Sequence, residues 1–239
     1  LCKWSNEWLL RFNVQKCKVI SYGKKANHVE YHMTDDSGRE TILNRDDSEK
    51  DIGIWFKSIL SFEQHINCTV NKVNKIIGLI KRKFTYMDKS LFLTLYKALI
   101  RSHIDYGNLV YHQSTKKCKQ LIENIQRRAT AIVPEIRGLS YTERLKELNL
   151  PSLDYRRKRY DLIQVFKIIH NIDDANIEDF FTFAGNSGTR GHNLKLTKPK
   201  AKESSRLNSF SHRVVSSWNS LPEDIVTSNN VHSFKTKLD

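Results

Sequence analysis

The sequence predicts an α+β protein that is mainly helical, with a small β-hairpin or sheet edge at the N-terminus followed by a three-helix bundle and further helices. Three observations support this prediction. Turn residues separate short extended stretches before residue 60, the spacing of apolar residues changes to about 3.6 after it, and capping residues precede several apolar runs. With 239 residues, 39% of them hydrophobic, the chain can bury a real core.

The first 60 residues are predicted to form short strands joined by turns. Residues 14–22 form one β-type stretch, and residues 29–34 and 40–43 form a pair. Asp35-Asp36-Ser37-Gly38, between the pair, is typical of a hairpin turn. Residues 52–56 add a further apolar run. We interpret this block as the edge of a mixed sheet.

Three amphipathic helices are predicted between residues 61 and 134. Apolar side chains in each recur three or four positions apart, and the joins are short, so the helices should pack as a compact bundle. The first carries Phe62, Ile66, Val70, Val73, Ile77, Ile80 and Phe84, with Lys72, Lys75 and Arg82 off this stripe; the second carries Leu91, Phe92, Leu95, Tyr96 and Leu99; the third carries Leu121, Ile122, Ile125, Ala129, Ile132 and Val133.

Further helices are predicted beyond residue 139. Ser140-Tyr141-Thr142-Glu143 has the pattern of a capping box, and Ser152 should begin a long helix that ends near Asn171. Residues 184–206 are predicted as an exposed loop, after which helical spacing returns. These patterns divide the chain into residues 1–60, 61–138 and 139–239.

The net charge of +14 is concentrated in the middle of the chain. Residues 61–170 hold 21 Lys and Arg against 9 Asp and Glu, whereas the blocks on either side are almost balanced. Such an imbalance disfavours the compact state unless a polyanion neutralises it, and nucleic acid and an anionic membrane surface are the two candidates. No apolar run approaches the roughly 20 residues that cross a bilayer, so a membrane-spanning protein is not expected.

The four cysteines, Cys2, Cys17, Cys68 and Cys118, are scattered and form no Cys-x-x-Cys pair. We interpret them as small core residues in a reducing compartment and expect an intracellular protein of the nucleus, the cytoplasm or both. No metal site is predicted. Because residue 1 is Leu and not Met, we expect the chain to begin partway through a longer protein.

Three basic clusters are candidates for contacting phosphates. Lys81-Arg82-Lys83 and Arg127-Arg128 lie near the ends of predicted helices, where the helix dipole favours cations, so a structural role and a phosphate contact are both open. Arg156-Arg157-Lys158-Arg159 lies in the first turns of a helix, where the dipole disfavours cations. This position favours a phosphate-facing role, although consecutive residues point in different directions and at most two can contact one backbone.

No catalytic residue is predicted. Asp35-Asp36 superficially resembles the Tyr-x-Asp-Asp box of polymerases, but three residues separate Tyr31 from the pair, which leads into a turn. The chain contains neither a Gly-x-Ser-x-Gly motif nor a phosphate-binding Gly-x-x-x-x-Gly-Lys loop. We therefore interpret Asp35 and Asp36 as turn residues.

A series of short motifs, ordered along almost the whole chain, resembles the C-terminal part of the reverse transcriptases of non-LTR retrotransposons of the jockey and CR1 kind. The motifs are Trp4–Asn13, Gln15–Val19, Lys50–Ile54, Leu60–Ile66, Gln126–Thr130, Thr189–Gly191, Phe210–Arg213 and Trp218–Pro222. Each motif is short, but their order and spacing together are specific. Ile52 stands where Leu is commoner in that family.

The resemblance implies the end of a polymerase palm in residues 1–60, a thumb-like bundle in 61–138 and a basic post-thumb region in 139–239. It also implies a primer-grip-like hairpin at Ile52, Gly53 and Ile54. A thumb packs against the template–primer duplex, so contacts should be to the backbone and not to bases. The residues predicted to bind nucleic acid are Lys81, Arg82, Lys83, Arg127, Arg128, Arg156, Arg157, Lys158, Arg159 and Arg190.

The family's metal-binding carboxylates and nucleotide-binding strands would lie upstream of Leu1. The resemblance thus implies part of an RNA-directed DNA polymerase, a nucleotidyltransferase that uses Mg²⁺ when complete, with no cofactor in this chain and no activity of the chain alone. The implied partners are an RNA template, an RNA/DNA hybrid, and the upstream palm and fingers of the same polypeptide. A non-catalytic nucleic-acid-binding or ribonucleoprotein scaffold derived from such an element, and a decayed fragment of one, remain alternatives.

Overall fold

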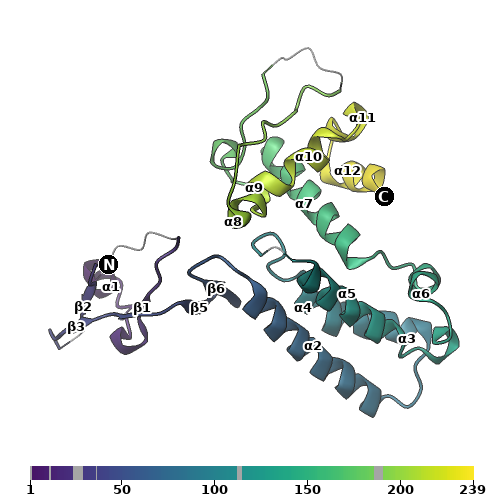
Figure 1. The fold of residues 1–239 in the computed structure, drawn as a ribbon, viewed down its shortest axis with the longest axis horizontal. Helices are drawn as coiled ribbons and strands as arrows, with labels where there is room; N and C mark the ends of the chain where they lie inside the picture. Colours follow the sequence, from purple (N-terminus) through teal and green to yellow (C-terminus); the bar gives the residue numbers. More distant parts are fainter. Residues whose placement is uncertain (1, 11, 24–28, 36, 112–114, 186–190) are drawn as a thin grey trace. The chain divides into compact units, whose positions relative to one another are not determined.

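The computed structural model describes residues 2–10, 12–23, 29–35, 37–111, 115–185 and 191–239, without the side chains of Cys2 and Asn6. The chain divides into two compact units, residues 1–65 and residues 66–239. The described strands lie in the first unit and most of the helices in the second, as Figure 1 shows. The protein is therefore α+β and mainly helical, which confirms the predicted fold class.

Three separate pairs of short strands make up the β structure of the first unit. β2–β3 and β5–β6 are antiparallel, whereas β1–β4 is parallel. Within the described residues no strand joins two pairs. The strands are β1 (Lys18–Val19), β2 (His32–Thr34), β3 (Glu40–Ile42), β4 (Asn44–Arg45), β5 (Ser48–Asp51) and β6 (Ile54–Lys57).

The strand predicted over residues 14–22 is mostly absent. A short helix, α1 (Cys2–Glu7), is followed by a 3₁₀ turn, η1 (Val14–Lys16), which Lys16 N–H closes on the Asn13 carbonyl at 2.9 Å. Val14 is buried but residues 15 and 16 are exposed, so this stretch lacks the alternation that stabilises a half-buried strand. The β-type composition alone did not form a strand.

The turn predicted between β2 and β3 is observed in its described residues. One carboxylate oxygen of Asp35 accepts hydrogen bonds from Ser37 N–H at 2.9 Å, Ser37 Oγ at 2.6 Å and Arg39 N–H at 2.9 Å. These bonds lower the pKa of Asp35, and the bond from the Ser37 hydroxyl has the largest effect. Its interpretation as a turn residue is confirmed, while Asp36 lies outside the described residues.

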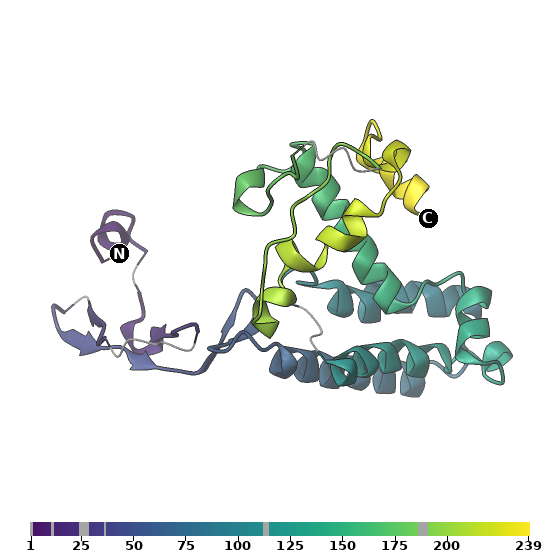
Figure 2. The same cartoon turned by 45° about the horizontal axis from the view of Figure 1, so that its top comes forward.

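Three helical stretches form the bundle predicted after residue 61. They are α2 (Glu63–Lys83), a continuous run of α3 (Lys89–Leu95), η2 (Tyr96–Arg101) and α4 (Ser102–Asp105), and α5 (Lys116–Thr130). Figures 1 and 2 show them side by side. The middle run contains a turn of π-helix at η2, where Tyr96 and Ile100 are fully buried. The core between the helices includes Val73, Ile77, Phe92, Ile122 and Ile125.

The bundle continues into a second helical layer. α6 (Tyr141–Glu147) begins at the predicted capping box, in which Ser140 and Glu143 bond reciprocally. α7 (Leu153–Ile169), capped by Ser152, contacts α5 and leads to the C-terminal helices, as Figure 2 shows. Two 3₁₀ turns, η3 (Pro134–Ile136) and η4 (Ile177–Asp179), complete the connections. The C-terminal helices are α8 (Ser204–Leu207), α9 (Phe210–Arg213), α10 (Val215–Asn219), α11 (Glu223–Val226) and α12 (Val231–Leu238).

A second hydrophobic core lies between α7 and the C-terminal helices. Phe166 stacks on Phe234 with centroids 4.3 Å apart, and Trp218 is fully buried. The predicted exposed loop at 184–206 is partly wrong, because His192 and Leu196 are buried against this core. The Asn219 amide fixes Leu196 by bonding its backbone N–H at 2.9 Å and its carbonyl at 2.8 Å, a long-range contact that the loop's own composition does not reveal.

None of the helices in the described residues is both long and apolar enough to cross a membrane. The cysteines are less uniform than predicted. Cys118 is buried, as expected of a core residue, but Cys17 is half-buried and Cys68 is exposed. All three are free thiols.

Candidate nucleic-acid interface

The excess positive charge belongs entirely to the second unit. Residues 66–239 hold 30 Lys and Arg against 16 Asp and Glu, whereas residues 1–65 hold 10 of each. The excess of positive charge therefore separates the two units more sharply than it separates the three blocks of the sequence. A polyanion attracted by this chain would be attracted to the helical unit.

Helix α2 carries five exposed cations, here called the α2 stripe: Lys72, Lys75, Arg82 and Lys83 on one side of the helix, and Lys81 on another. Positions three, four and seven apart lie on the same side of a helix, and the opposite side, including Val73 and Ile77, is buried. From residue 72 to residue 83 the stripe extends about 16 Å at ~1.5 Å per residue. In the described part of the chain, no carboxylate pairs with these five cations.

The composition of α2 explains why its cations are unpaired. Its sole acidic residue is Glu63 in the first turn, so no carboxylate occurs one turn before or after any of the cations. Lys81, Arg82 and Lys83 form the last turn, where they also interact favourably with the helix dipole. The helix dipole therefore explains the position of these three cations. Their charges are nevertheless available to a ligand.

The pKa of His103 depends on the charge of Lys72. Partial burial lowers the pKa of His103, and the positive charge of Lys72 lowers it further. The imidazole on α4 therefore senses the ammonium group on α2.

The α5 helix adds cations at both ends. Lys116 and Lys119 are exposed in its first turns, after the N-cap Thr115, which accepts a hydrogen bond from Cys118 N–H at 3.1 Å. At the other end, the Arg127 guanidinium lies 4.6 Å from the centroid of the Tyr141 ring. Arg128 is exposed. Of the predicted pair, Arg127 is thus held by an aromatic ring, whereas Arg128 projects into solvent.

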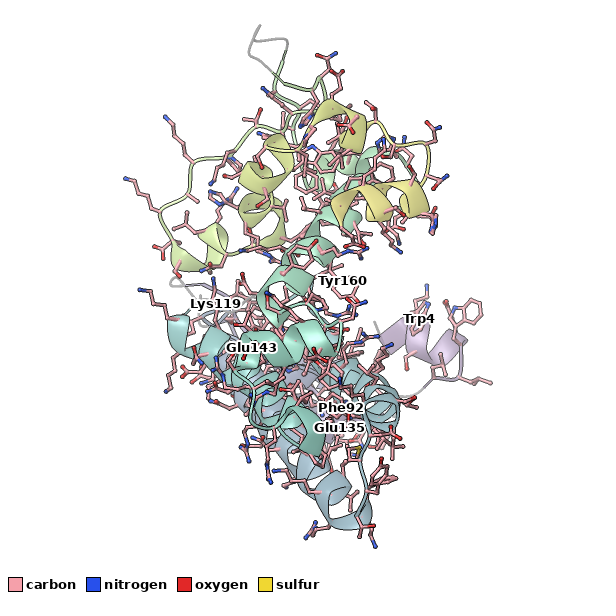
Figure 3. All side chains as sticks on the ribbon, turned by 90° about the vertical axis from the view of Figure 1, so that its right-hand side faces the viewer. Trp4, Phe92, Lys119, Glu135, Glu143 and Tyr160 are labelled. Carbon is pink, nitrogen blue, oxygen red and sulfur yellow. The ribbon has the colours of Figure 1, made fainter. Side chains whose placement is uncertain are left out.

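On α7, Arg156 is held by an intramolecular network. Its Nε and Nη2 donate to the two Asp105 carboxylate oxygens, with Nη2–Oδ2 at 2.7 Å and Nε–Oδ1 at 3.1 Å. The guanidinium also lies 4.8 Å from the centroid of Tyr160, which Figure 3 labels on this helix. Only about a fifth of each charged side chain is exposed, at 19% for Arg156 and 21% for Asp105. This pair ties α7 to the bundle.

The other three cations of the α7 cluster also have partners. Arg157 Nη2 donates to the Tyr111 hydroxyl at 2.6 Å, and Arg159 forms two bonds to Asp239, at 2.6 and 2.7 Å. Lys158 pairs with Asp154 one turn earlier, at 2.8 Å, but its side chain is 64% exposed.

Carboxylate partners explain why four cations can lie near the start of α7. Four cations near a helix N-terminus oppose the dipole, but Asp105, Asp154 and Asp239 converge on three of them. Binding of phosphate by this cluster stays a prediction. The structure shows that Arg156 and Arg159 already hold the fold together.

The hairpin at Ile52, Gly53 and Ile54 has a two-residue turn. Ile52 and Gly53 have φ of 41° and 79°, and the flanking residues Asp51 and Ile54 pair, which is the backbone of a type I′ turn. A β-branched residue seldom adopts this conformation, yet Ile52 is 81% exposed at the tip, whereas Ile54 is buried. The turn therefore presents an apolar side chain. Arg190, the remaining predicted residue, lies outside the described residues.

A metal centre is not assigned to this chain. Among the described residues, no three His, Cys, Asp or Glu side chains come together as a ligand set. The Mg²⁺ of a complete polymerase would need carboxylates from elsewhere.

Sequence reasoning missed several residues of this surface. Lys72 and Lys75 were detectable, because they lie off the apolar stripe of a predicted helix at i, i+3 spacing. Lys116 and Lys119 show the same signal at the start of α5. Asp105 and Tyr111 were not detectable as partners of α7, since 51 and 46 residues separate them from Arg156 and Arg157.

Comparison with known proteins does not assign a family. No protein-family model and no solved structure matches the chain. An uncharacterized protein of Caenorhabditis elegans is 26% identical over 125 residues, which is 51% of this chain and 61% of that protein. The chain thus matches about three fifths of the length of this relative.

Proposed function

We propose that this chain is the thumb-containing C-terminal part of an RNA-directed DNA polymerase of a non-LTR retrotransposon, and that residues 66–239 bind the template–primer duplex. One observation carries the proposal beyond the sequence resemblance. The cations of the α2 stripe are exposed, four of them on one side of the helix, and have no carboxylate partner in the described residues. A row of unpaired cations along a helix matches a phosphate backbone better than it matches an internal structural need.

The proposed contacts are independent of base sequence. Lysine ammonium groups and single guanidinium groups on a helix face bind phosphate oxygens, whereas base recognition requires side chains that reach into a groove. A polymerase must advance over any template, so backbone contacts suit this function. The exposed Ile52 at the tip of the β5–β6 hairpin supports an additional apolar contact in the proposed primer-gripping role.

A non-catalytic nucleic-acid-binding or ribonucleoprotein scaffold derived from such an element is the second candidate. The charge of the helical unit favours it equally, because a scaffold would use the same phosphate contacts. The two candidates differ only in what precedes Leu1 in the same polypeptide.

Two measurements test the proposal together. The reading frame upstream of Leu1 should encode a strand with a Tyr- or Phe-x-Asp-Asp box, and the protein including that region should extend a DNA primer on an RNA template with Mg²⁺. A frame without such a strand, joined to a chain that still binds hybrid duplexes of any sequence, would favour the scaffold. No binding to any hybrid or duplex would refute both.

A further inference from the structure

A hollow with an excess of cations lies where α5, α7, α9 and the start of α10 meet, and it brings two residues of the α7 cluster together with cations of α5 and α9. Helix α7 supplies Arg157 and Lys158, while α5 supplies Lys119, which Figure 3 labels. α9 supplies Arg213. Two carboxylates, Asp154 and Asp161, share the lining, so the hollow has four cations against two anions.

Both carboxylates are already neutralised by their own partners. Arg213 donates hydrogen bonds to the Asp161 carboxylate from Nε at 2.9 Å and from Nη2 at 2.8 Å. Its Nη1 also donates to the Asn208 carbonyl, and its Nη2 to the Leu109 carbonyl. The Arg213 and Asp161 side chains are only 10% and 14% exposed, so this pair forms a fixed wall. Lys158 pairs with Asp154. The surplus charge therefore belongs to Arg157 and Lys119.

Arg157 is held in place, yet it keeps an unused donor. Its Nη2 binds the Tyr111 hydroxyl, and the guanidinium lies 4.7 Å from the centroid of the fully buried Tyr111 ring. Its Nε is buried and has no hydrogen-bond partner among the described residues. A buried donor without a partner is unfavourable, so an acceptor brought to it would remove this penalty.

Lys119 supplies the second free charge. It is exposed, and in the described parts of the chain it pairs with no carboxylate. Partial burial raises the pKa of Asp154, but the hydrogen bond and charge of Lys158, together with the charges of Lys119 and Arg157, outweigh it and lower that pKa. Lys119, Arg157 and Lys158 therefore all interact electrostatically with the Asp154 carboxylate.

We propose that this hollow binds one phosphate group of a nucleic-acid backbone, which accepts hydrogen bonds from Arg157 and Lys119. Guanidinium and ammonium groups together match the several acceptor oxygens of a phosphate. The Arg213–Asp161 pair positions the wall without binding the ligand. This inference rests on the proposed function and adds a contact on α7, separate from the α2 stripe.

The test measures affinity of the 239-residue chain for a labelled RNA/DNA hybrid by fluorescence anisotropy over a series of salt concentrations. Lys119→Gln is measured alone, and the double variant Lys119→Gln, Arg157→Gln is compared with a control of equal charge loss, Lys97→Gln with Lys146→Gln, at exposed cations elsewhere. Because Arg157 also contacts Tyr111, thermal unfolding of each variant is followed by circular dichroism, and Lys119→Gln alone provides a reading that does not depend on that contact.

The loss of one phosphate contact should reduce the slope of log affinity against log salt by about 0.9 in the double variant, with a smaller reduction in Lys119→Gln. The control should keep the wild-type slope. If wild type binds and both pocket variants match the control, the hollow is not a phosphate site but the proposed function survives. If wild type itself does not bind, the proposed function fails and this inference fails with it.

A second probe separates a backbone phosphate from a free one. Adding inorganic phosphate, and separately the hybrid, should shift the NMR signal of the Arg157 Nε–H group in the same direction. A shift with inorganic phosphate but not with bound hybrid would show a site for small anions only, and would overturn the inference.

Discussion

The α2 stripe and the α7 cluster contain the same kinds of residue but differ in what surrounds them. On α7, Arg156, Arg157 and Arg159 are held by Asp105, Tyr111 and Asp239, which come from distant parts of the chain. On α2, the cations have neither local nor distant carboxylates in the part of the chain that the structure describes. A run of basic residues in a sequence therefore does not indicate a ligand-binding surface until its internal partners are known.

The direction of the difference is opposite to the sequence prediction. Position within the helix suggested that the α7 cluster was the better phosphate-binding candidate and that the α2 cluster had an equally good structural explanation. The structure gives Arg156 and Arg159 of α7 a structural role and leaves the α2 cations exposed. Substitutions should separate these two roles.

The largest effect on stability is expected at Arg156. Arg156→Gln leaves the mostly buried Asp105 carboxylate without its bidentate partner, so the free energy of unfolding should fall by about 2 kcal/mol. Arg82→Gln, the same change on α2, should alter it by less than about 0.5 kcal/mol. Urea unfolding followed by circular dichroism measures both. A double-mutant cycle with Asp105→Asn should show strong coupling, and additive effects would contradict the network.

The next largest effect is expected on the affinity for nucleic acid. Replacing four cations of the α2 stripe by Gln should lower the affinity for RNA/DNA hybrids of every sequence by roughly tenfold or more, with the fold unchanged. Fluorescence anisotropy measures it. A control that removes four dispersed cations should lose much less, and equal losses would show that only net charge matters. The stripe variant changes Lys75, Lys81, Arg82 and Lys83, and the control changes Lys97, Arg137, Lys146 and Lys202.

A smaller effect distinguishes the members of the α7 cluster from one another. Arg159→Gln should lower the free energy of unfolding by about 1 kcal/mol at neutral pH, whereas Lys158→Gln, whose pair is more exposed, should change it by less than ~0.5 kcal/mol. The hydrogen bond from Arg159 lowers the pKa of Asp239 against the opposing effect of burial.

The pH dependence of that effect has a definite sign. A carboxyl whose pKa is lowered by folding stabilises the protein above its unfolded pKa of about 3.9 and loses this contribution as the pH falls through the lowered value. The difference between wild type and Arg159→Gln should therefore be full above about pH 4 and vanish in stronger acid. A difference that persists in strong acid would show that the Asp239 pair is not its source.

The smallest expected effect is at His103. Its pKa is lowered by burial and by Lys72, so Lys72→Gln should raise it by a fraction of a unit, since burial is the larger cause. A phosphate beside Lys72 should also raise it, because it neutralises the same charge. NMR titration of the His103 ring protons, with and without hybrid, measures both shifts. An unchanged pKa in the bound state would place the nucleic acid away from this end of the stripe.

Local patterns predicted much of the helical unit. The caps at Ser140 and Ser152 and the apolar stripes of α2 and α5 are properties of consecutive residues, so they could be read directly. Strands were harder, because a strand is stabilised by its partner. The stretch at 14–22 had β-type composition without alternation, and most of it did not pair.

The candidate interface was predictable only in part. Charge along the chain located the excess in the helices, but whether a cation is free depends on residues far away in sequence, such as Asp105 for Arg156 and Asp161 for Arg213. The hollow between α5, α7 and α9 has no signature in any single segment. Such features follow from packing and not from pattern.

The salt dependence of binding tests the central claim most directly. The 239-residue chain is titrated against a labelled RNA/DNA hybrid, and against a second hybrid of unrelated sequence, over a series of salt concentrations. Contacts to several backbone phosphates predict equal affinity for both hybrids and a steep fall with salt, with a slope of log affinity against log salt of about −3 or steeper. Affinity that does not change with salt, or no binding at all, would contradict the account.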